Sequence, residues 1–92
     1  MTRIDEEARA AFLASHEGWT ITDETMTKTF VLQDFNAALG FVTRVGLLAE
    51  VADHHPDIDI RWNKVTLALS THSEGALTRK DTDLAELIER LG

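Results

Sequence analysis

Two adjoining stretches in the second half of the chain alternate apolar and polar residues, and this pattern most constrains the fold. The stretches are DIDIRW, residues 57–62, and VTLALSTH, residues 65–72. Alternation of period two is typical of antiparallel strands with one face on the core and one in solvent. Asn63 and Lys64 are predicted to form the tight connection between them. The residues predicted to face the core are Ile58, Ile60, Trp62, Val65, Leu67 and Leu69.

A second pair of strands is predicted before residue 33. WTI, residues 19–21, and TMTKTFVL, residues 25–32, are rich in threonine and other residues that favour strands. Asp23 and Glu24 lie between them and predict a short turn.

Three helices are predicted, over residues 5–15, 35–53 and 79–91. Asp34 and Thr78 are N-cap candidates for the second and third helices, and Pro56 ends the second helix because a residue before proline avoids helical angles. The predicted buried residues are Ala8, Ala11, Phe12 and Leu13; Phe35, Ala38, Leu39, Val42, Val45, Ala49 and Ala52; and Leu84, Leu87, Ile88 and Leu91. Phe41 and Leu48 lie beside the second of these faces, as core residues or, alternatively, as a contact with another subunit.

The element order is therefore αββαββα. Because each strand has only one apolar face, the helices need to pack on one side of the sheet only. This predicts a two-layer α+β fold. In this fold a four-stranded antiparallel sheet carries three helices on one face. A length of 92 residues predicts a single domain, residues 1–92.

The charge balance excludes several classes of partner. Nine basic residues stand against sixteen acidic ones, so the basic patch needed for nucleic acid or an anionic membrane is not expected. The chain lacks cysteine, and no uninterrupted apolar run approaches the roughly 20 residues of a membrane span. The first residues are too acidic and polar for a signal peptide. A soluble, cytoplasmic protein is expected.

Three of the four histidines lie between residues 49 and 72. Pro56 forces His55 into an extended conformation, so its ring is expected to point away from that of His54, which disfavours a shared metal ion. Proton transfer involving His54, His55 and His72 fits better, because imidazole exchanges protons near neutral pH. Glu50, one helical turn before His54, could orient a ring or a substrate amine.

Each of these residues also has a structural interpretation. His54 could cap a helix, His72 could end a strand, and Glu50 could be a solvated helix residue. Asp81 completes the pattern Thr78-Arg79-Lys80-Asp81, for which a capping box is the favoured interpretation. A metal site built from the three histidines and Asp81 remains a further alternative. The residues alone therefore predict an acid–base cluster without naming a substrate.

The run AEVADHHPDI, followed by WNKV, TLALSTH and GALTRKD, resembles the pterin-4a-carbinolamine dehydratase family. The upstream FVLQDFNAALGFVTRVGLLAE is similar as well, so the resemblance covers roughly residues 19 to 91. It implies the same fold, with dimers or tetramers built through helix packing. It also implies dehydration of 4a-hydroxytetrahydrobiopterin to quinonoid dihydrobiopterin, without a metal or other cofactor. This reaction recycles the pterin cofactor of aromatic amino acid hydroxylases.

The resemblance also implies residue roles. By position, the catalytic residues are His54, His55 and His72, and the substrate-binding residues are Glu50, Pro56, Asp57 and Asp81. Ile58 departs from the aromatic residue of many members, and Lys80 departs from the arginine of some members, which bears on pterin affinity. The alternative function is a non-catalytic interaction or assembly scaffold, since the family includes a transcription-factor dimerisation cofactor and relatives that assist Rubisco assembly. The three histidines favour the enzyme.

Overall fold

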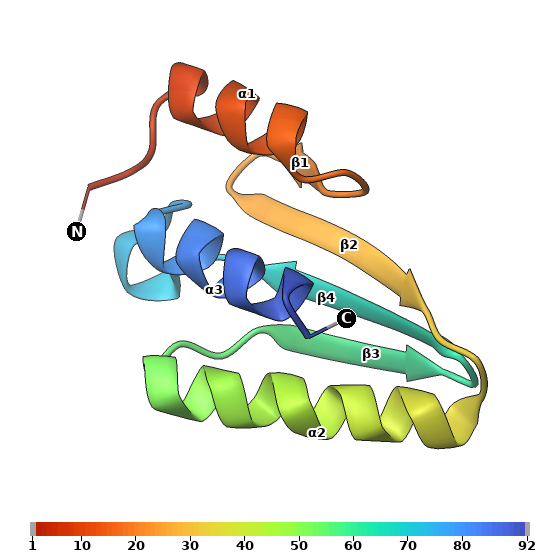
Figure 1. The fold of residues 1–92 in the computed structure, drawn as a ribbon. Coiled ribbons are helices and arrows are strands. Elements are labelled where there is room, and N and C mark those ends of the chain that lie inside the picture. Colours follow the sequence, from red (N-terminus) through yellow and green to blue (C-terminus); the bar gives the residue numbers. More distant parts are fainter. Residues whose placement is uncertain (1, 92) are drawn as a thin grey trace.

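The computed structural model describes residues 2–91, and its elements follow the predicted order αββαββα (Figure 1). The helices are α1 (Glu6–Ser15), α2 (Phe35–Ala52) and α3 (Arg79–Glu89), with a short 3-10 helix at His72–Glu74. The strands are β1 (Thr20–Thr22), β2 (Thr25–Val31), β3 (Asp57–Arg61) and β4 (Lys64–Leu69). The predicted α+β fold is confirmed.

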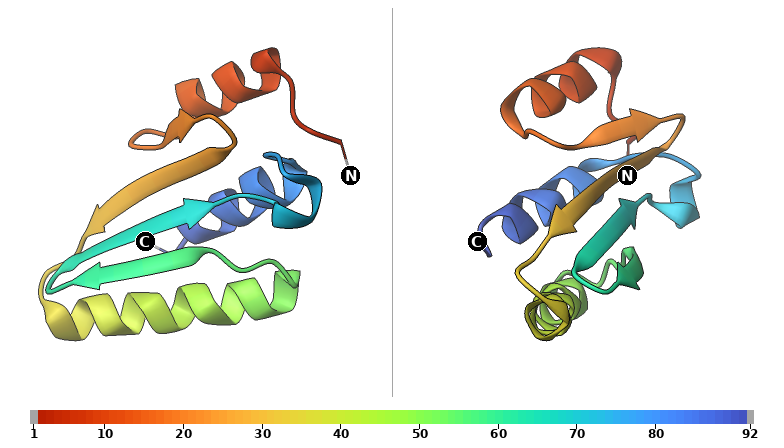
Figure 2. Two further views of the ribbon diagram at one scale, coloured as in Figure 1. Left: turned by 180° about the vertical axis from the view of Figure 1, so that it is seen from behind. Right: turned by 90° about the vertical axis from the view of Figure 1, so that its right-hand side faces the viewer.

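The four strands form one antiparallel sheet in the order β1-β2-β4-β3. The two longest pairings join β2 and β3 to β4 over most of their lengths. The helices gather on one face, with α3 across its middle, while no helix of residues 2–91 covers the other face (Figure 2).

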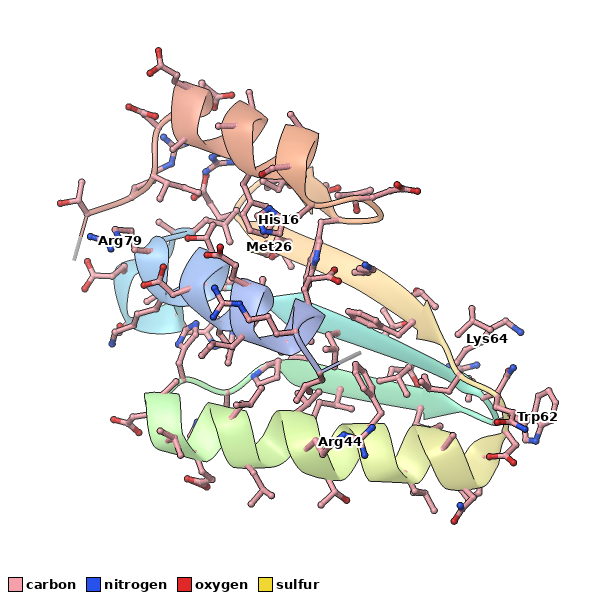
Figure 3. All side chains as sticks on the ribbon, in the orientation of Figure 1. His16, Met26, Arg44, Trp62, Lys64 and Arg79 are labelled. Carbon is pink, nitrogen blue, oxygen red and sulfur yellow. The ribbon has the colours of Figure 1, made fainter. Side chains whose placement is uncertain are left out.

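The core lies between the helices and the central strands. Met26 of β2 and Val65, Leu67 and Leu69 of β4 are fully buried on the helix-facing side, and Met26 lies at the centre of the molecule (Figure 3). Leu84, Ala85 and Ile88 of α3 cover them. Burying one such large apolar side chain is worth about 1.5–3 kcal/mol.

Helix α2 begins at the predicted N-cap, since the Asp34 side chain accepts a hydrogen bond from the Ala37 N–H at 2.8 Å. Its buried face is rotated from the predicted one and consists of Ala38, Phe41, Val45 and Ala49. Phe41 packs against Phe30 of β2 with ring centroids 4.9 Å apart, which confirms its interpretation as core. Phe35, Leu39 and Ala52, predicted to be buried, are exposed.

By length and composition alone, α2 could cross a membrane, with a mean hydropathy of 1.3 over its 18 residues. One face of the helix, 22% of these residues, is buried in the core against α3 and β4. Arg44 and Glu50 also interrupt the apolar run.

The hairpin between β3 and β4 corrects the prediction for Trp62. Arg61 pairs with Lys64, so the two-residue turn is Trp62-Asn63 and not Asn63-Lys64. Trp62 therefore leaves the strand, takes a left-handed φ of 50° and is 64% exposed at the tip of the hairpin (Figure 3). Ile58 is 39% exposed because β3 is an edge strand.

The outer helices show smaller differences. Ala8 and Ala11 of α1 are exposed, and Arg9 is buried in their place beside Phe12. Leu87 of α3, predicted to be buried, is 39% exposed, and Ala85 occupies the core instead.

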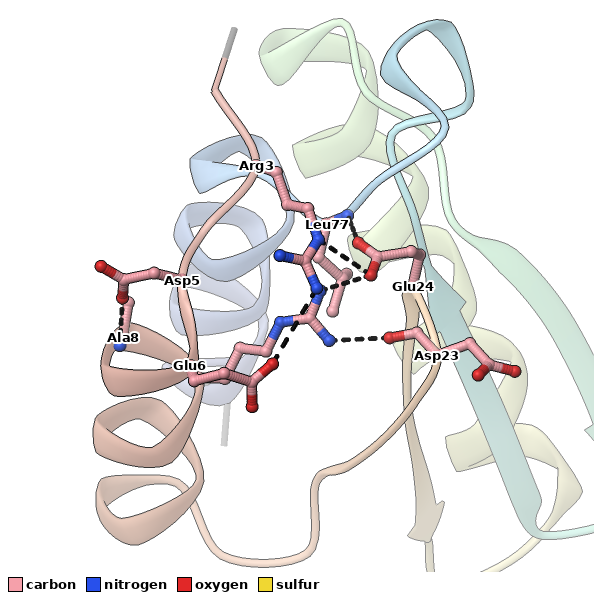
Figure 4. A network of polar contacts seen from close by, with 8 residues as sticks. Arg3, Asp5, Glu6, Ala8, Asp23, Glu24 and Leu77 are labelled. Carbon is pink, nitrogen blue, oxygen red and sulfur yellow. Dashed lines mark hydrogen bonds and ion pairs between the residues drawn. The ribbon is translucent and has the colours of Figure 1, made fainter.

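The Glu24 carboxylate, in the β1–β2 turn, links the N-terminal segment to the residues just before α3 (Figure 4). Glu24 accepts hydrogen bonds from the Leu77 N–H at 2.9 Å, from Arg9 Nη2 at 2.6 Å and from Arg3 Nε at 3.0 Å. The Leu77 N–H, followed by Arg9, holds the pKa of Glu24 at about 2, below its ordinary value of 4.5.

This arrangement predicts an acid-dependent contribution to stability. A carboxylate with a lowered folded-state pKa stabilises the fold above its unfolded pKa, and the contribution is lost as pH falls from 4.5 towards about 2. Glu24→Gln should therefore be less stable than wild type at neutral pH, and the difference should shrink in acid. Urea unfolding at a series of pH values measures this. Glu86→Gln, on the exposed side of α3, is the control, and an equal deficit for Glu24→Gln at every pH would contradict the assignment.

Candidate active site

The predicted site residues meet at one end of the sheet, where α2 ends, β4 runs into the 3-10 helix and α3 begins (left in Figure 1). A pocket of about 270 Å³ opens there. The residues that line it are Asp53, His54, His55, Ser70, Thr71, His72, Ser73 and Lys80. The three predicted histidines thus share one pocket, although they come from two separate segments of the chain.

Asp81 is the buried support of this pocket. It is the third residue of α3 and is 0% exposed. Its Oδ2 accepts hydrogen bonds from the Thr78 N–H at 3.0 Å and from Thr71 Oγ1 at 2.8 Å. The first bond belongs to the predicted capping box, which is confirmed. The second bond connects α3 to the chain just after β4.

The other oxygen of Asp81 holds a histidine. Oδ1 lies 2.5 Å from Nε2 of His54, whose side chain is only 10% exposed. A carboxylate accepts hydrogen bonds, so Nε2 carries the proton and donates it. This leaves Nδ1 as the ring nitrogen that can exchange a proton with a bound molecule. Asp81 therefore acts as the predicted helix cap and also as the partner of His54, a role that the sequence did not indicate.

The end of α2 directs His54 towards Asp81. Asp53 takes a left-handed conformation with φ of 51° and caps the helix through its N–H, which donates to Glu50 O and Ala49 O. The His54 N–H also donates to Ala49 O, at 3.1 Å. These bonds turn the chain sharply after the helix, in the manner of a left-handed helix cap.

His55 and His72 are more accessible than His54. Nε2 of His55 lies 3.4 Å from Oε1 of Glu50, and the two side chains are 55% and 74% exposed. Glu50 thus pairs with His55 and not with His54. His72 does not end a strand but opens the 3-10 helix, exposed at the pocket. The site combines one mostly buried, oriented imidazole with two exposed ones.

Pro56 and Asp57 lie beside the main pocket and do not line it. Pro56 leads the chain into β3. Asp57 is the first residue of that strand, where it pairs with Ala68 of β4. It lines a smaller adjoining pocket together with His55 and His72.

Thr71 is a site residue that sequence reasoning missed. It is buried, and its hydroxyl lies 2.8 Å from both Thr78 Oγ1 and Asp81 Oδ2. In the sequence it is one threonine among many strand threonines, and its role depends on how β4 and α3 meet. Its place directly before His72 is the only sequence signal that could have singled it out.

Within residues 2–91, no group of three or more His, Asp or Glu side chains has an arrangement that could hold a metal ion. His54 and His55 turn to different carboxylates, Asp81 and Glu50, as the extended backbone before Pro56 suggests.

Comparison with known proteins gives consistent matches. The family model for pterin 4 alpha carbinolamine dehydratase matches residues 2–91. A protein of Roseiflexus sp. (strain RS-1) is 49% identical over 90 residues, covering 98% of this chain and 97% of its own. One from Roseiflexus castenholzii is 57% identical over 74 residues, covering 80% of each. Both carry pterin-4-alpha-carbinolamine dehydratase as a provisional name.

Two solved structures share the fold. A Brucella melitensis protein described as a transcriptional coactivator/pterin dehydratase superposes with a TM-score of 0.91 at 33% identity, over 97% of both chains. A pterin dehydratase-like protein described as a RuBisCO assembly factor of the alpha-carboxysome has a TM-score of 0.68 at 19% identity. It covers 83% of this chain and 90% of its own, and it shows the fold alone.

The dual role of Asp81 predicts a large stability effect. In Asp81→Asn an amide NH2 must face at least one of the groups that now donate to the carboxylate. Either a buried donor then loses its partner, or His54 must change tautomer, and the charge-assisted hydrogen bonds are lost in both cases. We expect a loss of about 2–4 kcal/mol in the free energy of unfolding, measured by urea titration at neutral pH. Asp83→Asn, exposed on the same helix, should change it by less than about 0.5 kcal/mol. Equal stability of the two variants would contradict this role.

Proposed function

Because the chain belongs to the pterin 4 alpha carbinolamine dehydratase family, we propose that it dehydrates 4a-hydroxytetrahydrobiopterin to quinonoid dihydrobiopterin. The observation that carries the proposal is the pocket in which His54, His55 and His72 converge beside the buried Asp81. The pocket is large enough to admit part of a two-ring ligand, and its lining is rich in groups that transfer protons. Recycling of a pterin cofactor for aromatic amino acid hydroxylases, in the cytoplasm, is the corresponding physiological role.

The reaction requires two proton transfers. The C4a–O bond breaks as the leaving hydroxyl gains a proton, the N5–H loses its proton, and a C4a=N5 double bond forms. The products are quinonoid dihydropterin and one water. A general acid and a general base placed on the same edge of the ring can perform both steps.

His54 is suited to act as the base. Its Nε2–H donates to Asp81 at 2.5 Å, so the ring is oriented and Nδ1 can accept the N5 proton. The buried carboxylate then stabilises the imidazolium that forms, as the aspartate of a catalytic triad does. His55 and His72, exposed on the pocket wall, can deliver the proton to the leaving hydroxyl. Glu50 lies 3.4 Å from Nε2 of His55 and can orient its ring.

A homodimer or homotetramer is also proposed, and its surface differs from the one that the sequence indicated. Phe41 belongs to the core. An exposed ridge along α2 is formed instead by positions four residues apart, with Thr43 in the middle: Phe35, Leu39, Leu47 and Val51. Leu47 and Val51 are 64% and 90% exposed. This ridge also favours the second candidate function, a non-catalytic interaction or assembly scaffold. The histidine pocket favours the dehydratase.

Histidine substitutions test the proposed chemistry. His54→Gln, His55→Gln and His72→Gln should each lower the rate of dehydration of freshly generated 4a-hydroxytetrahydrobiopterin, and His54→Gln should lower it by about 10²–10⁴-fold. His16→Gln is the control, because His16 stacks on Phe12 at the end of α1 and lies outside the pocket (Figure 3).

The spontaneous rate in buffer sets the baseline for this assay. Folded wild-type protein that does not exceed it would contradict the dehydratase and favour the scaffold. Equal activity of His54→Gln and His16→Gln would contradict the role assigned to His54.

A further inference from the structure

The histidine pocket continues into a second, smaller one. This side pocket has a volume of about 30 Å³ and shares His55, Ser70 and His72 with the main pocket. Its remaining lining residues are Thr25, Asp57, Ala68 and Leu69. Two of the histidines therefore form the boundary between a larger space and a much smaller one.

Strand register places the side pocket on the sheet face that carries no helix. Ala68 pairs with Asp57 on one side and with Thr27 on the other. Its neighbours Leu67 and Leu69 are fully buried on the helix side, so Ala68 faces the opposite way. Thr25 lies two residues before Thr27, and Ser70 lies two residues after Ala68, so both lie on this same face. The site thus opens onto both faces of the sheet at its end.

Three polar side chains of the side pocket have no side-chain partner within residues 2–91. Among residues 2–91, the Thr25 hydroxyl, the Ser70 hydroxyl and the Asp57 carboxylate make no hydrogen bond or ion pair with one another or with any other side chain. A carboxylate can only accept hydrogen bonds, whereas the two hydroxyls can donate or accept. At about 30 Å³, against about 270 Å³ for the main pocket, the space suits a small polar group such as a hydroxyl better than a ring.

Pterin chemistry places a substituent at this point. C6 is bonded to N5, which is bonded to C4a, so a C6 side chain leaves the ring from the edge at which the proposed reaction occurs. If His55 and His72 protonate the hydroxyl on C4a, then a substituent on C6, which is joined to C4a through N5, begins close to these two residues. Both of them border the side pocket.

We propose that the side pocket is a subsite for a hydroxyl group on the C6 side chain, so that the protein selects polyhydroxyalkyl pterins over 6-methyl pterin. The inference rests on the proposed function. Such a hydroxyl donates to Asp57 and accepts from Thr25 or Ser70. Thr25 is the residue to test, because it lines the side pocket and not the main one.

The test compares two substrates, 4a-hydroxytetrahydrobiopterin and 4a-hydroxy-6-methyltetrahydropterin. The measured quantity is the ratio of their kcat/KM values. Thr25→Val removes the hydroxyl and keeps the shape of the side chain, and it should lower this ratio by about three- to tenfold, as expected for one hydrogen bond. Thr27→Val, on the same face of β2 but outside both pockets, should leave the ratio unchanged. An unchanged ratio in Thr25→Val, or an equal fall in both variants, would overturn the subsite.

Failure of the proposed function gives a different result, namely no turnover of either substrate by wild type. Calorimetric titration then decides the subsite separately, with 7,8-dihydrobiopterin and 6-methyl-7,8-dihydropterin as stable probes. Tighter binding of the first probe, with a preference that Thr25→Val removes and Thr27→Val keeps, would support the subsite. Equal affinities, or no binding, would overturn it.

Discussion

The carboxylate of Asp81 is the constraint on which the arrangement of the site depends. A fully buried charge is costly unless it is paired and hydrogen-bonded, and Asp81 meets this requirement by dividing its two oxygens. Oδ2 binds the N-cap of α3 and Thr71 after β4, and Oδ1 binds His54 after α2. One side chain thus joins three segments that are far apart in sequence. The fold and the orientation of the proposed base are therefore two results of a single interaction.

The position of this carboxylate explains why one histidine of the site is shielded from solvent and the other two are exposed. Held against a buried group, His54 is largely shielded and has one orientation, whereas His55 and His72 remain at the surface, where molecules arrive. The site lies at the end of the sheet, so it borders both the helix-covered face and the open one. The pocket therefore has an ordered, shielded side and an accessible side, and it does not interrupt the apolar core around Met26 and Leu67.

The core residues of β4 and the starts of two helices could be predicted from the sequence, because apolar–polar alternation and N-capping are local signals. The residues Val65, Leu67 and Leu69 and the N-caps Asp34 and Thr78 follow directly from them. The buried face of α2 could not be chosen this way, because two ridges of the helix have helical spacing, and contact with Phe30 selects the one that contains Phe41. Trp62 continues the alternation but lies in the turn, because strand pairing sets where the hairpin reverses. The partnership of Asp81 with Thr71 and His54 exists only in three dimensions.

The most direct test of this account is the tautomer of His54 in solution, read from the ¹⁵N chemical shifts of the imidazole rings. We predict that, in the neutral ring, Nε2 of His54 carries the proton, which its hydrogen bond to Asp81 protects from exchange with water, and that Nδ1 carries none. The ring of His16 provides the reference within the same spectrum, because within residues 2–91 its Nδ1 contacts Ser15 Oγ and the Phe12 carbonyl but no carboxylate. A His54 ring with its proton on Nδ1, or with an Nε2–H that exchanges as fast as the ring protons of His16, would contradict the central role of Asp81.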